Sequence, residues 1–373
     1  MGASLGFIPG FLATVLSEDL DVSRGKIGLI VGIYFGSTGI GSIPAGRLTD
    51  KFGARKVATV NMLLVAGASL GIAFFDSYAT WIIGSVVGGM GYALGNTSTN
   101  VAIGHAVPIE RRALAMSVKT SGVPLMATVA AATAPWAANV WQWERILVFN
   151  ALVAAITGVF TYFILDDDRS EATTGGIANP LPKDFYWFGI AAFLLIGGSQ
   201  PLYSWTVSYL EESLGSPASL SGGIMAFASF TGVIVMICNG VWADKLGTLK
   251  RIPLIMILLT ASALSVCLVI LGTVAGTSIV IIGLTLGVST QLAAIGTMHA
   301  AVIDKAPKSV GKATGITMTG YYLGALVTPA GFGLLVDISD TYIYSWLGTL
   351  AILITAVGAW YRAGKVEVQS DAL

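Results

Sequence analysis

One short motif occurs twice in this chain, and each copy lies between two long apolar segments. The first copy, at residues 46–56, reads Gly-Arg-Leu-Thr-Asp-Lys-Phe-Gly-Ala-Arg-Lys. The second, at residues 240–251, reads Gly-Val-Trp-Ala-Asp-Lys-Leu-Gly-Thr-Leu-Lys-Arg and keeps Gly-x-x-x-Asp-Lys-x-Gly with a basic residue three positions later. The two aspartates, Asp50 and Asp244, are 194 positions apart in a chain of 373 residues. The sequence therefore predicts two similar halves.

The residue types of the motif suit a tight connection between two membrane helices. Gly46 permits close approach of a neighbouring helix, Gly53 can adopt the positive φ of a turn, and the basic residues remain in water beside anionic lipid headgroups. The end of a soluble helix could use the same residues. The apolar flanks, which occur at equivalent places in both halves, make the signal specific for a membrane protein.

Composition supports this interpretation. Apolar residues make up 55% of the chain and charged residues only 11%, which excludes an ordinary soluble protein. The 46 glycines fit membrane helices, where small residues allow close packing. We predict an all-α polytopic membrane protein. A net charge of zero without a basic tail argues against a nucleic-acid partner, and no Cys/His spacing resembles a metal site, so we expect no metal and no cofactor.

The apolar segments predict twelve transmembrane helices, at residues 2–16, 26–49, 57–75, 79–107, 112–138, 144–165, 185–214, 219–243, 252–274, 278–303, 311–336 and 342–363. The first would span only ~22 Å of a ~30 Å hydrocarbon core, so we expect that its start is missing. The seventh contains residues 197–205, a polar run rich in helix-breaking residues, which we expect to interrupt the helix and to face a cavity.

The two motif copies resemble the signature loop between helices two and three of the major facilitator superfamily and its weaker counterpart between helices eight and nine. The resemblance covers nearly the whole chain. It implies twelve helices in two six-helix bundles, related by pseudo-two-fold symmetry, around a central cavity that opens alternately to either side. The N-terminal bundle is then residues 1–165 and the C-terminal bundle residues 185–373, with residues 166–184 as a cytoplasmic linker.

The basic residues predict the orientation in the membrane. With both motif loops on the cytoplasmic side, sixteen of the 20 Lys and Arg residues fall in inner segments, three in outer segments and one within a helix. Basic residues accumulate in cytoplasmic loops, so we predict a multi-pass protein of the cell (inner) membrane with both termini in the cytoplasm. We expect a monomer surrounded by the lipid bilayer.

Lys119 is the basic residue predicted deep within a helix, ~10 Å along it from Arg112. An ammonium group there costs at least ~2.5 kcal/mol on insertion scales, so it should face a wet cavity or a negative charge. The alternative is a structural lysine that extends toward the cytoplasm. No Asp or Glu falls near the middle of a predicted helix. A transported anion could supply negative charge beside Lys119, which favours an anionic over a cationic substrate.

Polar and aromatic residues on other predicted helices complete the candidate substrate site, namely Asn96, Asn100, Gln200, Tyr203, Trp205, Gln291, His299 and Tyr321. For each of them the alternative is packing between helices or a place in the aromatic belts. His299 could titrate and couple protons, although a lone histidine near a helix end more often forms a neutral hydrogen bond. Coupling to a proton or exchange for a second anion therefore both stay open.

The resemblance implies a gating role for charged and glycine residues of the motifs, in which contacts between the halves hold the cytoplasmic side closed and break when it opens. These residues are Gly46, Asp50, Lys51, Gly53, Arg55, Asp244, Lys245 and Asp304. The alternative is a role in topology and loop folding alone.

The segment Lys-Thr-Ser-Gly-Val-Pro at residues 119–124 resembles bacterial members of the superfamily near the cyanate- and nitrate-type and organic-anion carriers. We therefore predict a secondary active transporter that moves a small, anionic solute by alternating access. The alternative within the fold is an exporter of drugs or other hydrophobic compounds, which would be expected to carry a glycine-rich motif on helix five and a membrane-embedded acid. A receptor with a transporter fold also stays open. No metal or nucleophile constellation indicates an enzyme.

Overall fold

The computed structural model of the chain describes residues 2–75, 77–106, 109–165, 181–306 and 310–367. Within this part the backbone forms fourteen helices. They are α1 Ser4–Phe11, α2 Ala13–Asp19, α3 Arg24–Phe52, α4 Ala54–Phe75, α5 Tyr78–Ala106, α6 Ile109–Trp141, α7 Trp143–Ile164, α8 Tyr186–Ser204, α9 Thr206–Leu214, α10 Ala218–Leu246, α11 Thr248–Ala275, α12 Thr277–Lys305, α13 Val310–Ser339 and α14 Tyr342–Gly364.

The fourteen helices correspond to the twelve predicted segments because two of those segments are split. The break in predicted helix seven falls at Trp205, between α8 and α9, four residues after Pro201. The break in predicted helix one falls at Leu12, between α1 and α2, three residues after Pro9. Proline lacks an N–H group and weakens the helix around it. The two breaks are 193 positions apart, close to the spacing of the two motifs, so the repeat extends to helix shape.

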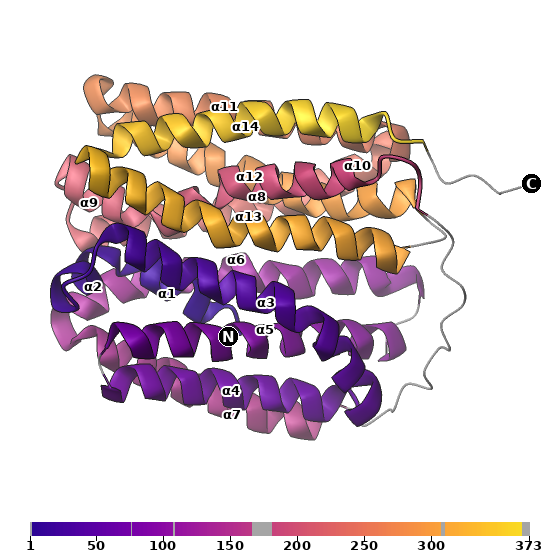
Figure 1. The fold of residues 1–373 in the computed structure, drawn as a ribbon, viewed down its shortest axis with the longest axis horizontal. Coiled ribbons are helices and arrows are strands. Elements are labelled where there is room, and N and C mark those ends of the chain that lie inside the picture. Colours follow the sequence, from indigo (N-terminus) through magenta and orange to yellow (C-terminus); the bar gives the residue numbers. More distant parts are fainter. Residues whose placement is uncertain (1, 76, 107–108, 166–180, 307–309, 368–373) are drawn as a thin grey trace, which may run out of the picture.

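Figure 1 shows α1–α7, from indigo to magenta, on one side of the molecule and α8–α14, from red to yellow, on the other. Within the first half α4 packs against α5 and α7, and within the second half α11 packs against α12 and α14. The halves meet where α3 packs against α13 and where α6 packs against α10. Seven of the helices are long and apolar enough to cross a membrane by themselves, in a search confined to the described residues.

The two ends of the molecule differ in what they carry. At one end, termed the motif end, α3 meets α4 at Gly53 and α10 meets α11 at Gly247. These glycines have φ of 85° and 78°, the positive values that the motif predicts for its turns. At the opposite end α3 begins at Arg24, where the Ser23 side chain accepts a hydrogen bond from the backbone N–H of Lys26. Because of the charge contacts described below, this is termed the ion-pair end.

The halves touch closely at the ion-pair end. A Cβ atom added to Gly28 would lie 2.2 Å from the carbonyl oxygen of Pro329, and one added to Gly32 would lie 2.1 Å from that of Leu326. The backbones of α3 and α13 are therefore in direct contact there. At the second contact between the halves, a Cβ added to Gly222 of α10 would lie 2.2 Å from the carbonyl oxygen of Ala131 on α6.

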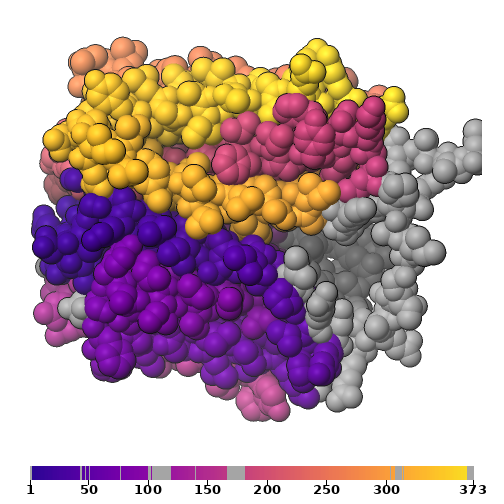
Figure 2. Space-filling view, viewed as in Figure 1, coloured from indigo at the N-terminus to yellow at the C-terminus, as the bar shows by residue number. Residues whose placement is uncertain are grey.

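The halves separate toward the motif end. A Cβ atom added to Gly46, further along α3, would meet no described atom within 4 Å. The same is true of Gly122 on α6 and Gly240 on α10. In Figure 2 the indigo and orange surfaces meet at the ion-pair end, on the left of the view. In this conformation Gly46 therefore has no close contact with the described residues of a neighbouring helix.

Candidate functional site

A cavity of about 1290 Å³ lies between the two halves. Helices α1, α3, α4, α5 and α6 line it from one half, and α8, α10, α12 and α13 from the other. Its lining on α3 runs from Phe35 to Ser42 and on α13 from Gly315 to Leu326. These stretches extend from the middle of each helix toward the motif end, so the cavity occupies the space where the halves diverge.

Lys119 on α6 provides positive charge in this cavity. Its Nζ donates hydrogen bonds to the side-chain Oδ1 of Asn96 and, at 3.4 Å, to the backbone carbonyl oxygen of the same residue. Asn96 is on α5 of the same half as Lys119, and Tyr322 of α13 lines the cavity from the other half. The described lining of the cavity includes no Asp or Glu. A cavity with an ammonium group and no described carboxylate has a positive pole.

His299 lies close to this pole. Its side chain is exposed to the cavity, and its Nδ1 is 2.9 Å from the carbonyl oxygen of Ile295, one turn earlier on α12. The residue is close enough to Lys119 for the charge of one to act on the other. His299 is thus a titratable group from the second half that faces the Lys119 of the first.

Aromatic rings and methionines form much of the remaining wall. The rings of Tyr321 and Tyr322 have centroids 5.5 Å apart and those of Phe7 and Tyr203 5.9 Å apart. Rings provide flat apolar surfaces, and methionine adapts its shape to what it contacts. The methionines of the lining are Met62, Met126, Met236 and Met318. The wall therefore suits a small organic body next to the charged pole.

The cavity brings together six of the residues that the sequence analysis selected, namely Asn96, Lys119, Gln200, Tyr203, His299 and Tyr321. Asn100 is on α5, but its side chain lies outside the described part of the structure. Sequence reasoning missed Tyr92, which also lines the cavity, and it expected Ser199 to face a cavity as part of residues 197–205 without selecting it as a site residue. Tyr92 is four positions before Asn96 on the same helix, so helical periodicity was the signal that could have found it.

Trp205 and Gln291 do not line the cavity, which corrects the prediction for both. The indole Nε1 of Trp205 donates a hydrogen bond of 3.1 Å to the carbonyl oxygen of Pro329, and its ring stacks on that of Phe332 at 5.7 Å between centroids. Gln291 is fully buried on α12. Trp205 therefore attaches the break between α8 and α9 to α13, and its side chain packs between helices.

The charged residues of the second motif contact one another within their own half. Arg251 donates a hydrogen bond of 2.9 Å to Asp244 and hydrogen bonds of 2.9 and 2.8 Å to the two carboxylate oxygens of Asp304. These residues lie on α11, α10 and α12. Lys245 is exposed near them. Arg251 was not among the predicted gating residues, although it belongs to the second motif copy.

The described charged residues of the first motif also make their contacts within their own half. The Nε of Arg55 donates a hydrogen bond to the carbonyl oxygen of Leu165, at the end of α7. The Lys51 ammonium lies over the ring of its neighbour Phe52, 5.2 Å from the centroid. The side chain of Asp50 lies outside the described residues. In this conformation the described contacts of the motif residues thus stay within one half.

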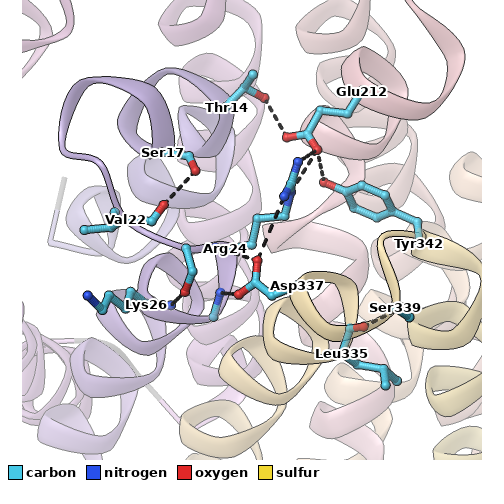
Figure 3. Close-up of polar contacts among 12 residues, drawn as sticks. Thr14, Ser17, Val22, Arg24, Lys26, Glu212, Leu335, Asp337, Ser339 and Tyr342 are labelled. Atoms are coloured by element: carbon cyan, nitrogen blue, oxygen red, sulfur yellow. Dashed lines mark hydrogen bonds and ion pairs between the residues drawn. The ribbon is translucent and has the colours of Figure 1, made fainter.

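Charge contacts between the halves occur instead at the ion-pair end, as Figure 3 shows. Arg24 of α3 donates to Glu212 of α9, with 2.8 Å from its Nε, and its guanidinium is 3.9 Å from Asp337 of α13. The Tyr342 hydroxyl donates a 3.1 Å hydrogen bond to Glu212. These four residues, Arg24, Glu212, Asp337 and Tyr342, form the Arg24 cluster. None of these four residues was among the substrate-site or gating residues selected from the sequence.

The family follows from comparison with known proteins. A model of the Major Facilitator Superfamily matches residues 1–329. The chain belongs to this superfamily. The match confirms the predicted resemblance and fold class, and the relatives that accompany it are transporters rather than enzymes. Together with its many apolar helices, membership of the superfamily makes the chain a multi-pass membrane transporter.

Two curated relatives and one solved structure are similar to this chain. The 4-hydroxybenzoate transporter PcaK of Acinetobacter baylyi is 22% identical over 158 residues, which are 42% of this chain but only 35% of the relative. The probable sulfoacetate transporter SauU of Cupriavidus necator is 22% identical over 381 residues, 93% of this chain and 86% of the relative. A bacterial homolog of the human lysosomal transporter Spinster, in an inward-facing and occupied conformation, superposes with a TM-score of 0.80 at 12% identity, covering 100% of this chain and 97% of that one. At this identity the structural likeness shows the fold alone.

Proposed function

We propose that this chain is a secondary active transporter that moves a small organic anion by alternating access through the cavity between its halves. The observation that carries the proposal is the Lys119 ammonium in a cavity whose described lining contains no carboxylate. A fixed positive charge in a partly desolvated space attracts an anion and disfavours a cation. The two relatives are named for 4-hydroxybenzoate and sulfoacetate, and both of these compounds are anions.

The alternating movement uses residues 1–165 and residues 185–373 as two bodies joined by residues 166–184. The present conformation is closed at the ion-pair end by the Arg24 cluster and by the contacts of Gly28 and Gly32 with α13. It is separated at the motif end, which the distribution of basic residues assigns to the cytoplasm together with both termini. In the opposite conformation the Arg24 cluster breaks, and the motif residues of the two halves approach each other.

The energy source in this proposal is a proton or an exchanged anion. His299 lines the cavity near Lys119. Histidine gains and loses a proton near neutral pH, so in this proposal His299 is the group that carries a coupled proton. A monomer suffices for the whole cycle because both halves of the cavity come from one chain.

The test is uptake into proteoliposomes that contain the purified protein. The compounds are radiolabelled 4-hydroxybenzoate and sulfoacetate, neutral 4-hydroxybenzamide and the hydrophobic cation tetraphenylphosphonium. We expect uptake of at least one anion and none of the other two compounds. Lys119→Gln should weaken the apparent affinity for that anion about 10- to 100-fold, because a hydrogen bond to a charged group is lost. Lys119→Arg should weaken it less, because the charge is kept while its shape changes.

The matched control is Lys250→Gln, which removes a lysine from an exposed position at the motif end and should leave the affinity unchanged. Wild-type uptake rates in Lys119→Gln would contradict the proposal. Transport of the hydrophobic cation without transport of any anion would favour the exporter instead.

A further inference from the structure

Helix α8 presents three polar side chains to the cavity from the half opposite Lys119. Ser199, Gln200 and Tyr203 line the cavity. They are also deeply buried, with exposed fractions of 1%, 4% and 5%. The Ser199 and Tyr203 hydroxyl groups and the Gln200 amide nitrogen have no hydrogen-bond partner among the described residues. Three adjacent polar groups of one helix are therefore buried at a cavity wall with unused hydrogen-bonding capacity.

Such an arrangement is unusual within a protein. Most buried polar groups are paired, because a buried donor or acceptor without a partner loses its hydration and gains nothing in return. Ser199 and Tyr203 are four positions apart, so they lie on the same face of α8 with Gln200 beside them. These atoms have almost no accessible surface in this conformation, so a rotation of the side chains toward the cavity is needed before one polar group of a ligand supplies the partners that they lack.

The packing around the end of α8 fixes the positions of Ser199, Gln200 and Tyr203. The ring of Tyr203 lies against that of Phe7 from α1, at 5.9 Å between centroids. Helix α8 ends one residue after Tyr203, and the next residue, Trp205, is held by its hydrogen bond to the carbonyl oxygen of Pro329. The end of α8 is thus anchored to α13 before any ligand binds. A preformed group of donors costs less to bind than a flexible one.

We propose that Ser199, Gln200 and Tyr203 form a second polar subsite, which binds a hydrogen-bonding group at the end of the substrate remote from its anionic group. The inference rests on the proposed function, since it takes the Lys119 pole as the place of the anionic group. The substrate is then a bifunctional organic anion. It carries an acid at one end, a hydroxyl, carbonyl or second acid oxygen at the other, and an apolar body against the aromatic wall between them.

The two subsites also lie on different halves, with Lys119 on α6 and the polar group on α8. A bifunctional ligand therefore bridges the moving bodies, whereas a ligand with the acid alone contacts the first half by its charge only. Binding of the second end favours the approach of the halves at the motif end. This provides a conformational readout that is independent of affinity.

The experiment measures binding by isothermal titration calorimetry with two matched pairs of ligands. The pairs are benzoate with 4-hydroxybenzoate and methanesulfonate with sulfoacetate, and in each pair the second compound adds a polar group at the far end. The variants are Tyr203→Phe, which removes one hydroxyl group, and Gln200→Leu, which removes the amide at similar volume. The control is Tyr209→Phe, because Tyr209 is buried in α9 and is not part of the described cavity lining.

In at least one pair the bifunctional compound should bind about tenfold more tightly to the wild type than its partner does. Tyr203→Phe and Gln200→Leu should each remove much of that difference and leave the affinity for the simpler acid unchanged, whereas Tyr209→Phe should change neither. Distances between spin labels at Lys56→Cys and Leu249→Cys, both exposed at the motif end, should shorten with the bifunctional compound more than with its partner. Cys238 and Cys267 are exposed and are replaced by Ser in this experiment.

Three results would overturn the inference. If both members of each pair bind the wild type equally, or if the α8 variants weaken both members alike, the second subsite does not exist. In that case the proposed function still holds if Lys119→Gln weakens the binding of every acid. If no acid of either pair binds, or if every acid binds Lys119→Gln as tightly as the wild type, both the inference and the proposed function fail.

Discussion

Asp337 caps the start of α3 at Arg24, across the interface between the two halves. Its carboxylate accepts hydrogen bonds from the backbone N–H groups of Arg24, at 3.1 Å, and Gly25, at 2.8 Å. Asp337 is near the end of α13 in the second half, whereas α3 belongs to the first. A carboxylate is favourable at a helix N-terminus because it satisfies free N–H groups and complements the helix dipole. Opening at the ion-pair end has to break this cap.

The first prediction follows from that cap. Asp337→Ala should shift the protein toward the conformation that is open at the ion-pair end by about tenfold, because a helix cap and a charged hydrogen bond typically contribute about 1–2 kcal/mol. Spin labels at Lys26→Cys and Ser219→Cys, both exposed at this end of opposite halves, would report longer distances. The control is Asp340→Ala, which removes an exposed acid nearby on the same half. Identical distance distributions in Asp337→Ala and the wild type would show that the cap does not hold this end closed.

The second prediction concerns the contact of α3 with α13. Gly32→Val places a side chain where a Cβ atom would already lie 2.1 Å from the carbonyl oxygen of Leu326, so the ion-pair end cannot close. The motif end should then close, and labels at Lys56→Cys and Leu249→Cys should move closer together. Gly71→Val is the matched control, because a Cβ at Gly71 would meet no described atom within 4 Å. The interpretation fails if Gly32→Val keeps the wild-type separation at the motif end.

The third prediction distinguishes the two carboxylates that share Arg251. The Asp304 side chain is 19% exposed and that of Asp244 74% exposed, so water screens the second ion pair far more than the first. Asp304→Asn should lower the apparent melting temperature by about 3 °C or more, since it leaves a largely buried guanidinium without its main partner. Asp244→Asn should lower it by less than about 1 °C. Scanning fluorimetry of the intrinsic tryptophans measures both values, and equal losses would mean that burial does not set the strength of these pairs.

The sequence was sufficient for the helices and their turns. Long apolar runs between charged loops define helices in a membrane protein, and the twelve predicted segments end within a few residues of the observed elements. The turn at Gly53 followed from the motif because only glycine readily adopts a positive φ there. The break near Trp205 followed from Pro201 and the adjacent glycines. The matching break at Leu12 was missed, although Pro9 gives the same signal three residues earlier.

The sequence was not sufficient for the faces of the helices or for contacts between the halves. Lys119 and Gln200 were placed in the cavity because a polar group rarely faces lipid. The same reasoning selected Gln291, which is buried on α12 outside the cavity lining, and polarity cannot separate these two places. The Arg24 cluster joins residues that are 188 and 313 positions apart. Only the packing of α3 against α13 brings such residues together.

The central claim is that a positive charge at position 119 binds the substrate anion, and restoring this charge chemically tests it most directly. In a background with Cys238 and Cys267 replaced by Ser, Lys119→Cys is treated with 2-aminoethyl methanethiosulfonate, which attaches an ammonium group, or with the neutral 2-hydroxyethyl reagent of matched size. Binding of 4-hydroxybenzoate and sulfoacetate is then measured by isothermal titration calorimetry. The account predicts that Lys119→Cys weakens binding about 10- to 100-fold, that the aminoethyl adduct restores most of it, and that the hydroxyethyl adduct does not. Wild-type affinity in unmodified Lys119→Cys, or equal rescue by the neutral adduct, would contradict it.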